Sequence, residues 1–174
     1  MTNKNLGLDI YKSKSYVLEY LKENSHKFTI ENLFYFQTKD WENNKNKIIE
    51  TIRKKFHQKI IIRSSAIGED SINNSEAGAY QSIQNVEPKS KKHVIESINS
   101  VIDSYKKKQN FDPKNEVLVQ TQSTNIITSG VVFTRTPEMG SPYYIINFED
   151  GSATDGVTKG IVNNTLKIFR GTDF

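Results

Sequence analysis

The chain has 174 residues, of which 35% are hydrophobic and 25% are charged, and its formal net charge is +4. This length predicts one domain with a sizeable core, and the mixed charges argue against a disordered chain. The absence of cysteine excludes disulfides and thiolate metal sites. No apolar run approaches the roughly 20 residues that span a bilayer, and residues 1–8 lack the apolar segment of a signal peptide. The composition therefore predicts a soluble, cytoplasmic protein.

Lysine supplies most of the positive charge, and only four arginines are present. A sequence pI of about 9.1 raises the question of nucleic-acid binding. The lysines are dispersed, however, and no basic stripe alternates with aromatic residues, which favours a solvated surface. The densest run, Lys106 to Lys108, closes a predicted helix, where cations interact favourably with the helix dipole.

The first part of the chain is predicted to form two helices and one strand. Hydrophobic spacing indicates an amphipathic helix over residues 13–24. A loose alternation of aromatic residues over 28–37 predicts a strand with a turn. Asp40 is expected to cap a second helix that runs through Phe56. The buried stripe of this second helix is predicted to be Ile48, Ile49, Ile52 and Phe56.

Residues 59–86 are expected to form two strands joined by a long loop. The apolar run over 59–64 predicts a strand that is buried on both faces. The loop over 65–79 consists of small and polar residues, and loops of this length inside a domain are usually functional. The alternation over 80–86 predicts a returning strand.

The second half is predicted to contain one regular helix followed by strands. Ser90 is expected to cap this helix. Its buried positions are predicted to be Val94, Ile98, Val101, Ile102 and Tyr105. The later elements are predicted as strands over 116–122, 130–135 and 143–148, a turn over 137–142, and a hairpin about Asn163–Asn164 that joins 161–162 to 166–169. Helices and strands mixed without regular alternation predict an α+β fold or a two-lobed mixed sheet.

The first candidate site follows the strand over 59–64. Arg63 is a planar donor that suits two phosphate oxygens at once. Ser64, Ser65 and the loop amides can donate to oxyanions, and Gly78 lets the backbone approach a ligand. The residues leave one alternative open, in which Arg63 pairs with a carboxylate of Glu69–Asp70 and only fixes the loop.

Two later strands also end in polar groups. Gln120 and Thr121 follow an apolar run whose backbone could face a flat ring such as adenine, and the alternative is an ordinary strand. Arg135 ends the predicted strand over 130–135, whose apolar run predicts a strand of the buried type, beside hydroxyl groups and before a turn with Pro and Gly. Two arginines in the same setting fit a polyphosphate, whereas the alternative is an Arg135 that faces solvent. No GxxxxGK[ST] motif is present, so a nucleotide would not bind through a P-loop.

The remaining polar residues give weaker signals. His26, His57 and His93 lie in separate segments without the spacing of metal ligands. Asp150 and Asp155 lie next to glycines, and a turn is favoured over a metal site there. No metal ligand is therefore assigned within the sequence.

Several short motifs occur in a fixed order along the chain. They are Arg63-Ser64-Ser65-Ala66, Glu69-Asp70, Ser75-Glu76-Ala77-Gly78, Asn85-Val86, Val117 to Gln120, Ser129 to Pro137, and Gly156 to Gly160. This order resembles the N-terminal ATP-grasp nucleotide-binding domain of phosphoenolpyruvate synthase and pyruvate phosphate dikinase. The resemblance implies an α+β, two-lobed fold of mixed sheets with flanking helices, incomplete at the C-terminus. It implies an N-terminal region over 1–58 and an ATP-grasp core over 59–174.

The resemblance also implies where ATP phosphates bind. Lys14 and Arg63 would hold them, and Ser64, Ser65 and a flap at Gly78 would close over them. The family lysine usually follows two glycines, which are missing from the segment around Lys14. This departure makes the N-terminal part less typical than the motifs that follow it.

The resemblance assigns the other end of the nucleotide as well. Gln120 and Thr121 would border the adenine, and Arg135 would stabilise the transferring group. The family moves a pyrophosphoryl group from ATP to a histidine on another domain, releases AMP and then phosphate, and passes the remaining phosphoryl group to an acceptor. Mg²⁺ is an implied cofactor, and its Glu and Gln ligands are expected downstream of Phe174. The phosphohistidine and acceptor domains are expected there too, so this chain alone is expected to be inactive.

The acceptor implied by the resemblance is pyruvate or, in one branch, glutamine. Asp40-Trp41 and Tyr143 to Asn147 resemble the branch found in bacterial surface-glycan clusters, to which glutamine kinase of capsule phosphoramidate synthesis belongs. An alternative function is a non-catalytic module that keeps the fold and binds a protein partner or nucleic acid. The dispersed lysines and the missing metal ligands motivate this alternative.

Overall fold

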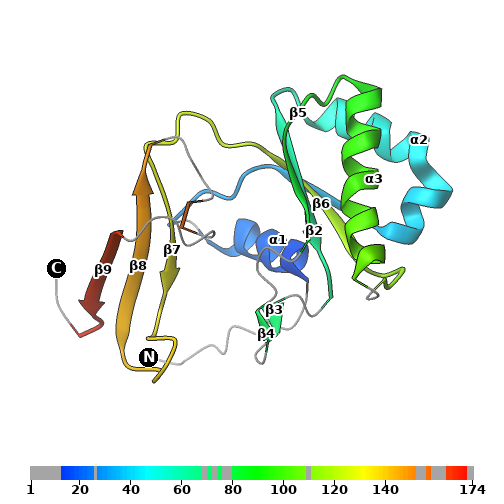
Figure 1. The fold of residues 1–174 in the computed structure, drawn as a ribbon. Helices are drawn as coiled ribbons and strands as arrows, with labels where there is room; N and C mark the ends of the chain where they lie inside the picture. The colour runs from blue at the N-terminus through cyan, green and yellow to red at the C-terminus, as the bar shows by residue number, and fades with distance from the viewer. Residues whose placement is uncertain are drawn as a thin grey trace. The chain divides into compact units, whose positions relative to one another are not determined.

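The chain folds into two units that divide after Gln122, and the larger sheet of each unit is antiparallel (Figure 1). The computed structural model describes residues 13–25, 27–67, 70–71, 74–75, 80–108, 111–151, 156–157 and 164–171. The predicted α+β class with flanking helices is confirmed. Within the described ranges every strand pair is antiparallel, so no sheet there is mixed in direction.

The first unit is built on a four-stranded sheet with the order β1-β6-β2-β5. Its strands are β1 (Leu33–Gln37), β6 (Glu116–Thr121), β2 (Ile60–Ser65) and β5 (Ser82–Val86). Helices α2 (Thr38–Lys55) and α3 (Lys91–Lys107) lie on one face, and α1 (Lys14–Asn24) lies on the other (Figure 1). The expected regions 1–58 and 59–174 both contribute strands to this sheet.

The core of the first unit lies between the sheet and helices α2 and α3. Both predicted helical stripes are buried. The cluster contains Phe36, Trp41, Ile48, Ile49, Ile52, Phe56, Ile60, Ile62, Val94, Ile98, Val101, Ile102, Tyr105, Val117 and Val119. The prediction that the apolar run of β2 is buried on both faces is wrong. Ile60 and Ile62 are 0% exposed, whereas Ile61 is half-buried, because successive side chains point to opposite faces and α2 and α3 pack on only one.

Local capping explains where the helices begin. The predicted cap of α3 is confirmed, since the Ser90 Oγ accepts a hydrogen bond of 3.3 Å from His93 N. The predicted cap of α2 is shifted. Asp40 does not precede α2 but is its third residue, where Oδ2 accepts a hydrogen bond of 3.3 Å from Gln37 N. None of the described helices is long and apolar enough to cross a membrane.

The segment between β2 and β5 is only partly described. The loop predicted over 65–79 contains one short antiparallel ladder, formed by β3 (Asp70–Ser71) and β4 (Asn74–Ser75). The predicted returning strand is confirmed as β5, which pairs with β2. Gly78 lies outside the described residues.

The second unit contains a three-stranded antiparallel sheet with the order β7-β8-β9. Its strands are β7 (Thr128–Phe133), β8 (Tyr143–Asp150) and β9 (Asn164–Phe169). Gly130 of β7 lies so close to β8 that an added Cβ would be 2.4 Å from the Asn147 carbonyl oxygen. This close approach explains why the Ser-Gly-Val motif has a glycine at this position.

Two predictions for the second unit need correction, and a third is only partly covered by the described residues. The strand predicted over 130–135 ends at Phe133, so Arg135 lies in the following turn. That strand is not of the buried type, because Val132 is 57% exposed and Phe133 is 41% exposed. Finally, the segment 166–169 pairs with β8 as part of β9, and 161–162 lies outside the described residues. Asn164 therefore begins a strand, and the predicted hairpin is not tested as a whole, because 161–163 lies outside the described residues.

Candidate functional site

The face of the first sheet that carries Arg63 differs from the face that α2 and α3 cover. Arg63 pairs with Leu118 of β6 and with Ser82 of β5, and paired residues in antiparallel strands share a face. We define the polar face by the following residues of the four strands: Tyr35, Arg63, Ser65, Ser82, Glu116 and Gln120. Helix α1 contacts this face through side chains that bond to Ser65 and Tyr35.

Arg63 occupies the middle of the polar face and is half-buried. Its Nε is buried and has no hydrogen-bond partner among the described residues, which also provide no ion pair to its guanidinium. A buried donor without an acceptor costs about 1–3 kcal/mol, and an oxygen atom of a ligand would remove that cost. The alternative partner Glu69 and the side chain of Asp70 lie outside the described residues.

Two polar residues near Arg63 differ in whether their buried side-chain oxygen has a hydrogen-bond partner. Glu116, at the start of β6, has a buried Oε2 without a hydrogen-bond partner among the described residues. Ser65, which is paired with Glu116, is 0% exposed, and its Oγ accepts hydrogen bonds of 2.9 Å from both the N and the Oγ of Ser15. Ser65 is therefore part of a buried network that connects β2 to α1.

The same network reaches α3 through a tyrosine. The Tyr105 hydroxyl accepts a hydrogen bond of 2.8 Å from Ser65 N and donates one of 2.6 Å to Glu116 O. Asn115 Oδ1 accepts a further hydrogen bond of 3.2 Å from Ile67 N. These contacts fix the chain directly after Arg63.

Lys14 is the first residue of α1 and precedes Ser15, so it lies at the α1 end that contacts β2. Its side chain is half-buried and has an interaction of its own. The structure thus brings the N-terminus of α1, with Lys14, to the same end of β2 as Arg63. The grouping of the two cations at one ligand stays a prediction.

Three other predicted residues of the first unit differ in which face of the sheet they occupy. Ser64 is buried on the helix-covered face, opposite Val117, so its side chain and that of Arg63 lie on different faces of β2. Gln120 lies on the polar face and is 8% exposed. Thr121 alternates to the other face, and its N–H donates a hydrogen bond of 2.9 Å to Asn32 O.

Arg135 belongs to the second unit, which is described by itself. It is exposed, and its Nη1 donates a hydrogen bond of 3.0 Å to Gly140 O within the turn after β7. In the same unit the buried Glu149 accepts hydrogen bonds at Oε1 from Ser129 Oγ at 3.2 Å and from Gly156 N at 2.9 Å. Glu149 therefore fixes the start of the predicted Gly156 to Gly160 motif to β8.

One titratable group on the polar face is clearly perturbed. The hydroxyl of Tyr35 donates a hydrogen bond of 2.6 Å to Oε2 of Glu19 in α1. This bond and partial burial raise the pKa of Tyr35 to about 12. The pair gives α1 a second attachment to the sheet, in addition to Ser15.

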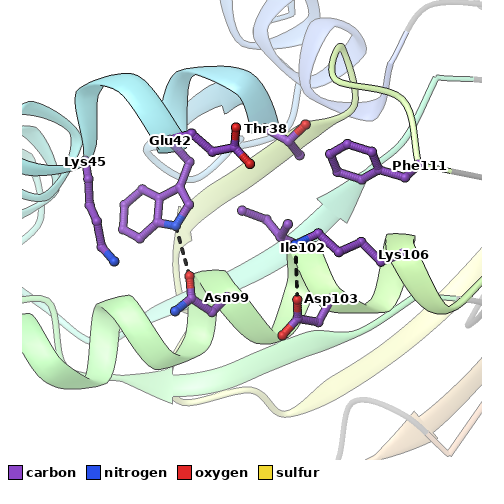
Figure 2. A pocket seen from close by; sticks show the side chains of 9 residues that line it. Thr38, Glu42, Lys45, Asn99, Ile102, Asp103, Lys106 and Phe111 are labelled. Atoms are coloured by element: carbon purple, nitrogen blue, oxygen red, sulfur yellow. Dashed lines mark hydrogen bonds and ion pairs between the residues drawn. The ribbon is translucent and has the colours of Figure 1, made fainter.

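A pocket of about 500 Å³ lies between α2 and α3 (Figure 2). It is lined by Thr38, Trp41, Glu42, Lys45, Asn99, Ile102, Asp103, Lys106 and Phe111. Its polar groups are largely satisfied internally, since Trp41 Nε1 donates a hydrogen bond of 2.9 Å to Asn99 Oδ1, and Lys106 pairs with Asp103 at 3.6 Å. No predicted site residue lines this pocket, so it is separate from the polar face.

The described ranges contain no group of three or more His, Cys, Asp or Glu side chains that could hold a metal ion. His93 Nδ1 accepts a hydrogen bond of 3.3 Å from Glu87 N, and Asp150 Oδ1 accepts one of 2.9 Å from Thr128 Oγ1. His26 and Asp155 lie outside the described residues. His93 and Asp150 thus have local structural partners.

Sequence reasoning missed Ser15, Glu116, Glu149 and the role of the Tyr105 hydroxyl. Tyr105 was predicted only as a core residue, and a polar atom on a core side chain is a signal that it needs a buried partner. Ser15 gives no such signal, because a serine near a helix start is usually solvated or a local cap. Glu149 adjoins Asp150, and nothing in the sequence separates a buried carboxylate from an exposed one.

Comparisons with known proteins were consistent with the ordered motifs. The family described as pyruvate phosphate dikinase, AMP/ATP-binding domain, matches residues 20–171. A search of curated proteins finds no match.

Two solved structures from Ca. Korarchaeum cryptofilum are similar to the chain. One, the dinucleotide forming acetyl-coenzyme A synthetase 1 in complex with coenzyme A, Ca-AMPCP and HgCl+, is 10% identical with a TM-score of 0.47 over 84% of this chain and 61% of that chain. The other, ACD1 in complex with coenzyme A, is 13% identical with a TM-score of 0.48 over 93% of this chain and 61% of that chain. This chain therefore spans 61% of the length of each structure.

Proposed function

Because the chain belongs to the pyruvate phosphate dikinase AMP/ATP-binding domain family, we propose that it supplies the ATP-binding part of a dikinase-type phosphotransferase. The single observation that carries the proposal is the buried Arg63 Nε, which has no acceptor among the described residues. Phosphate oxygens match the donors of a guanidinium in both geometry and charge. A bound polyphosphate would therefore satisfy Arg63 where the described chain does not.

The proposed roles follow the two ends of the nucleotide. Lys14 and Arg63 hold the phosphates, and a flap at Gly78 closes over them. The Gln120 amide borders the adenine from the polar face. Because the Thr121 N–H already donates to Asn32, any contact of Thr121 with the adenine comes from its other atoms.

Two further predicted residues keep narrower proposed roles. Arg135 offsets negative charge on the transferring group, as cations do in phosphoryl transfer. This requires Arg135 to exchange its hydrogen bond with Gly140 O for a ligand oxygen. Ser64, whose side chain lies on the helix-covered face, would contribute through its backbone.

The proposed reaction accounts for all three phosphates of ATP. A histidine nitrogen on another domain attacks the β-phosphorus, the bond to the oxygen that bridges the α-phosphate breaks, and AMP leaves. Hydrolysis then removes the terminal phosphate, and the remaining phosphoryl group passes to pyruvate or glutamine. Within this scheme the residues of this chain hold and orient ATP, and the acceptor is not among their contacts.

Magnesium is expected for a family that transfers phosphates. The described residues contain no group of three acidic or histidine side chains, and Mg²⁺ at a nucleotide usually takes only one or two protein carboxylates together with phosphates and water. No step of the proposal is therefore assigned to the ion.

Isothermal titration calorimetry with ATP, ADP and AMP in the presence of Mg²⁺ tests the proposal. Wild type is expected to bind ATP, and Arg63→Ala is expected to abolish or strongly weaken binding. Arg53→Ala is the matched control. Arg53 also has a buried Nε without a partner among the described residues, but its Nη1 pairs with Glu50 at 3.0 Å on α2.

Two results would contradict the proposal. One is equal ATP affinity in wild type and Arg63→Ala. The other is no nucleotide binding by wild type. If wild type then also gives a nucleic-acid gel shift that persists near 0.2 M salt, where purely electrostatic binding has weakened steeply, the non-catalytic alternative is supported.

A further inference from the structure

Two buried serines join the N-terminus of α1 to the end of β2. We propose that Ser15 and Ser65 are positioning residues that hold Lys14 beside Arg63, so that both cations meet one polyphosphate. This inference rests on the proposed function for the identity of the ligand. It deepens that function because it gives Ser65 a role through Lys14 instead of a direct contact with ATP.

In the serine pair, Ser15 and Ser65, the residue from β2 caps the N-terminus of α1. The first amides of a helix have no partner within the helix. The Ser13 Oγ accepts from Tyr16 N at 3.3 Å, as in an ordinary cap, while Ser65 Oγ accepts from Ser15 N at 2.9 Å. The Ser15 hydroxyl donates a second hydrogen bond of 2.9 Å to the same oxygen. Strand β2 thus caps α1 directly.

The bonded atoms are shielded from water and from ligands. Ser15 and Ser65 are both 0% exposed. The amide of Ser65 is also engaged, because it donates to the Tyr105 hydroxyl at 2.8 Å. Ser65 is therefore held by α1 and α3 together, and no surface of its side chain is available to a phosphate.

The geometry places both cationic residues next to the serine pair. Lys14 precedes Ser15, so their Cα atoms are about 3.8 Å apart. Arg63 and Ser65 share the polar face and are two residues apart on β2, which is about 7 Å along a strand. Both cations have long side chains, and the serine pair sets the distance between their backbones. Loss of the pair would leave each cation intact but change their separation.

A double-mutant cycle in ATP affinity tests this inference on the full chain. Calorimetry would compare wild type, Ser65→Ala, Lys14→Gln and the double variant. Ser65→Ala is expected to weaken ATP binding about tenfold, from the loss of two buried hydrogen bonds. In the Lys14→Gln background the same change is expected to weaken binding by less than about twofold, because coupled residues are not additive.

Two further variants separate positioning from general destabilisation. Ser97→Ala is the matched control, since Ser97 is a buried serine on α3 whose Oγ donates to His93 O at 2.8 Å. It is expected to leave ATP affinity unchanged. Ser15→Ala keeps the N–H donor to Ser65 and removes only the hydroxyl donor, so a smaller loss of about threefold is expected.

Three outcomes would overturn the inference. Equal losses from Ser65→Ala with and without Lys14 would show that Ser65 acts independently of Lys14. A lower melting temperature with unchanged ATP affinity would show that the serine pair only stabilises the fold. Absence of ATP binding by wild type would overturn the proposed function itself, and this inference with it. The first two outcomes leave the proposed function intact.

Discussion

The two faces of the first sheet are built from the same four strands but differ in chemistry. The face that packs on α2 and α3 is apolar, and its central residues, such as Ile60, Ile62 and Val119, are 0% exposed. The polar face carries Arg63 and Glu116, each with a buried atom that lacks a partner among the described residues. A two-residue repeat along each strand is enough to give the two faces different side chains in this way.

The two faces differ in what stabilises them and in how many buried polar groups lack a hydrogen-bond partner within the described part of the chain. The helix-covered face supplies the hydrophobic stabilisation, at roughly 25 cal/mol for each Å² of apolar surface removed from water. On the polar face, α1 is attached by hydrogen bonds from Ser15 to Ser65 of β2 and from Tyr35 of β1 to Glu19. Buried groups without partners usually mark strain or a functional role, and two of the three among the described residues, on Arg63 and Glu116, lie on the polar face.

The largest expected effect comes from neighbouring isoleucines of β2. Ile62→Ala removes a fully buried side chain and should cost about 2–5 kcal/mol of unfolding free energy. Ile61→Ala, one residue away on the polar face, should cost less than half as much because Ile61 is only half-buried. Urea denaturation of the two variants measures the difference. Equal losses would mean that the two faces do not differ in packing.

A smaller effect is expected where the two faces are joined. Tyr105→Phe keeps the ring in the core but removes the hydroxyl that bonds to Ser65 N and Glu116 O. We expect a loss of about 1–3 kcal/mol, because two buried backbone groups lose their partner. Amide hydrogen exchange should be faster at Ser65 than at the neighbouring β2 residues. Unchanged exchange at Ser65 would contradict the assigned network.

The smallest effect concerns pH. The pKa of Tyr35 is raised from 10.0 to about 12 by its hydrogen bond to Glu19, so the folded state retains this proton more strongly than the unfolded state. The contribution is fully present below pH 10 and is lost as the pH rises through about 12. Urea midpoints of wild type and Tyr35→Phe should therefore converge at high pH. A gap that stays constant over this range would argue against the Tyr35–Glu19 bond.

Local patterns made much of the first unit predictable. The helical stripe of α3 and its Ser90 cap follow from spacing and capping chemistry, which depend on residues close in sequence. The same reasoning found Arg63 at the end of an apolar run. It misjudged β2 as buried on both faces, because burial depends on which elements pack on each side.

Contacts between distant segments could not be predicted in the same way. Ser15 and Ser65 are separated by 50 positions, and neither residue has a local feature that indicates the other. In the second unit, the apolar run before Arg135 indicated a buried strand that ends at the arginine. Strand β7 instead ends at Phe133, since the turn bonds of Thr136 with Gly140 and Ser141 begin directly after it.

The central claim is that Arg63 is retained for a polyphosphate ligand and contributes little to folding. It is tested most directly by melting temperatures of wild type and Arg63→Met with and without ATP. Met keeps the apolar stem and removes the buried donor. Without ATP, the variant should melt at or above the wild-type temperature. ATP at a hundred times its Kd should stabilise wild type by about 2.7 kcal/mol and leave the variant unchanged. A variant that melts several degrees lower but still responds fully to ATP would contradict the claim.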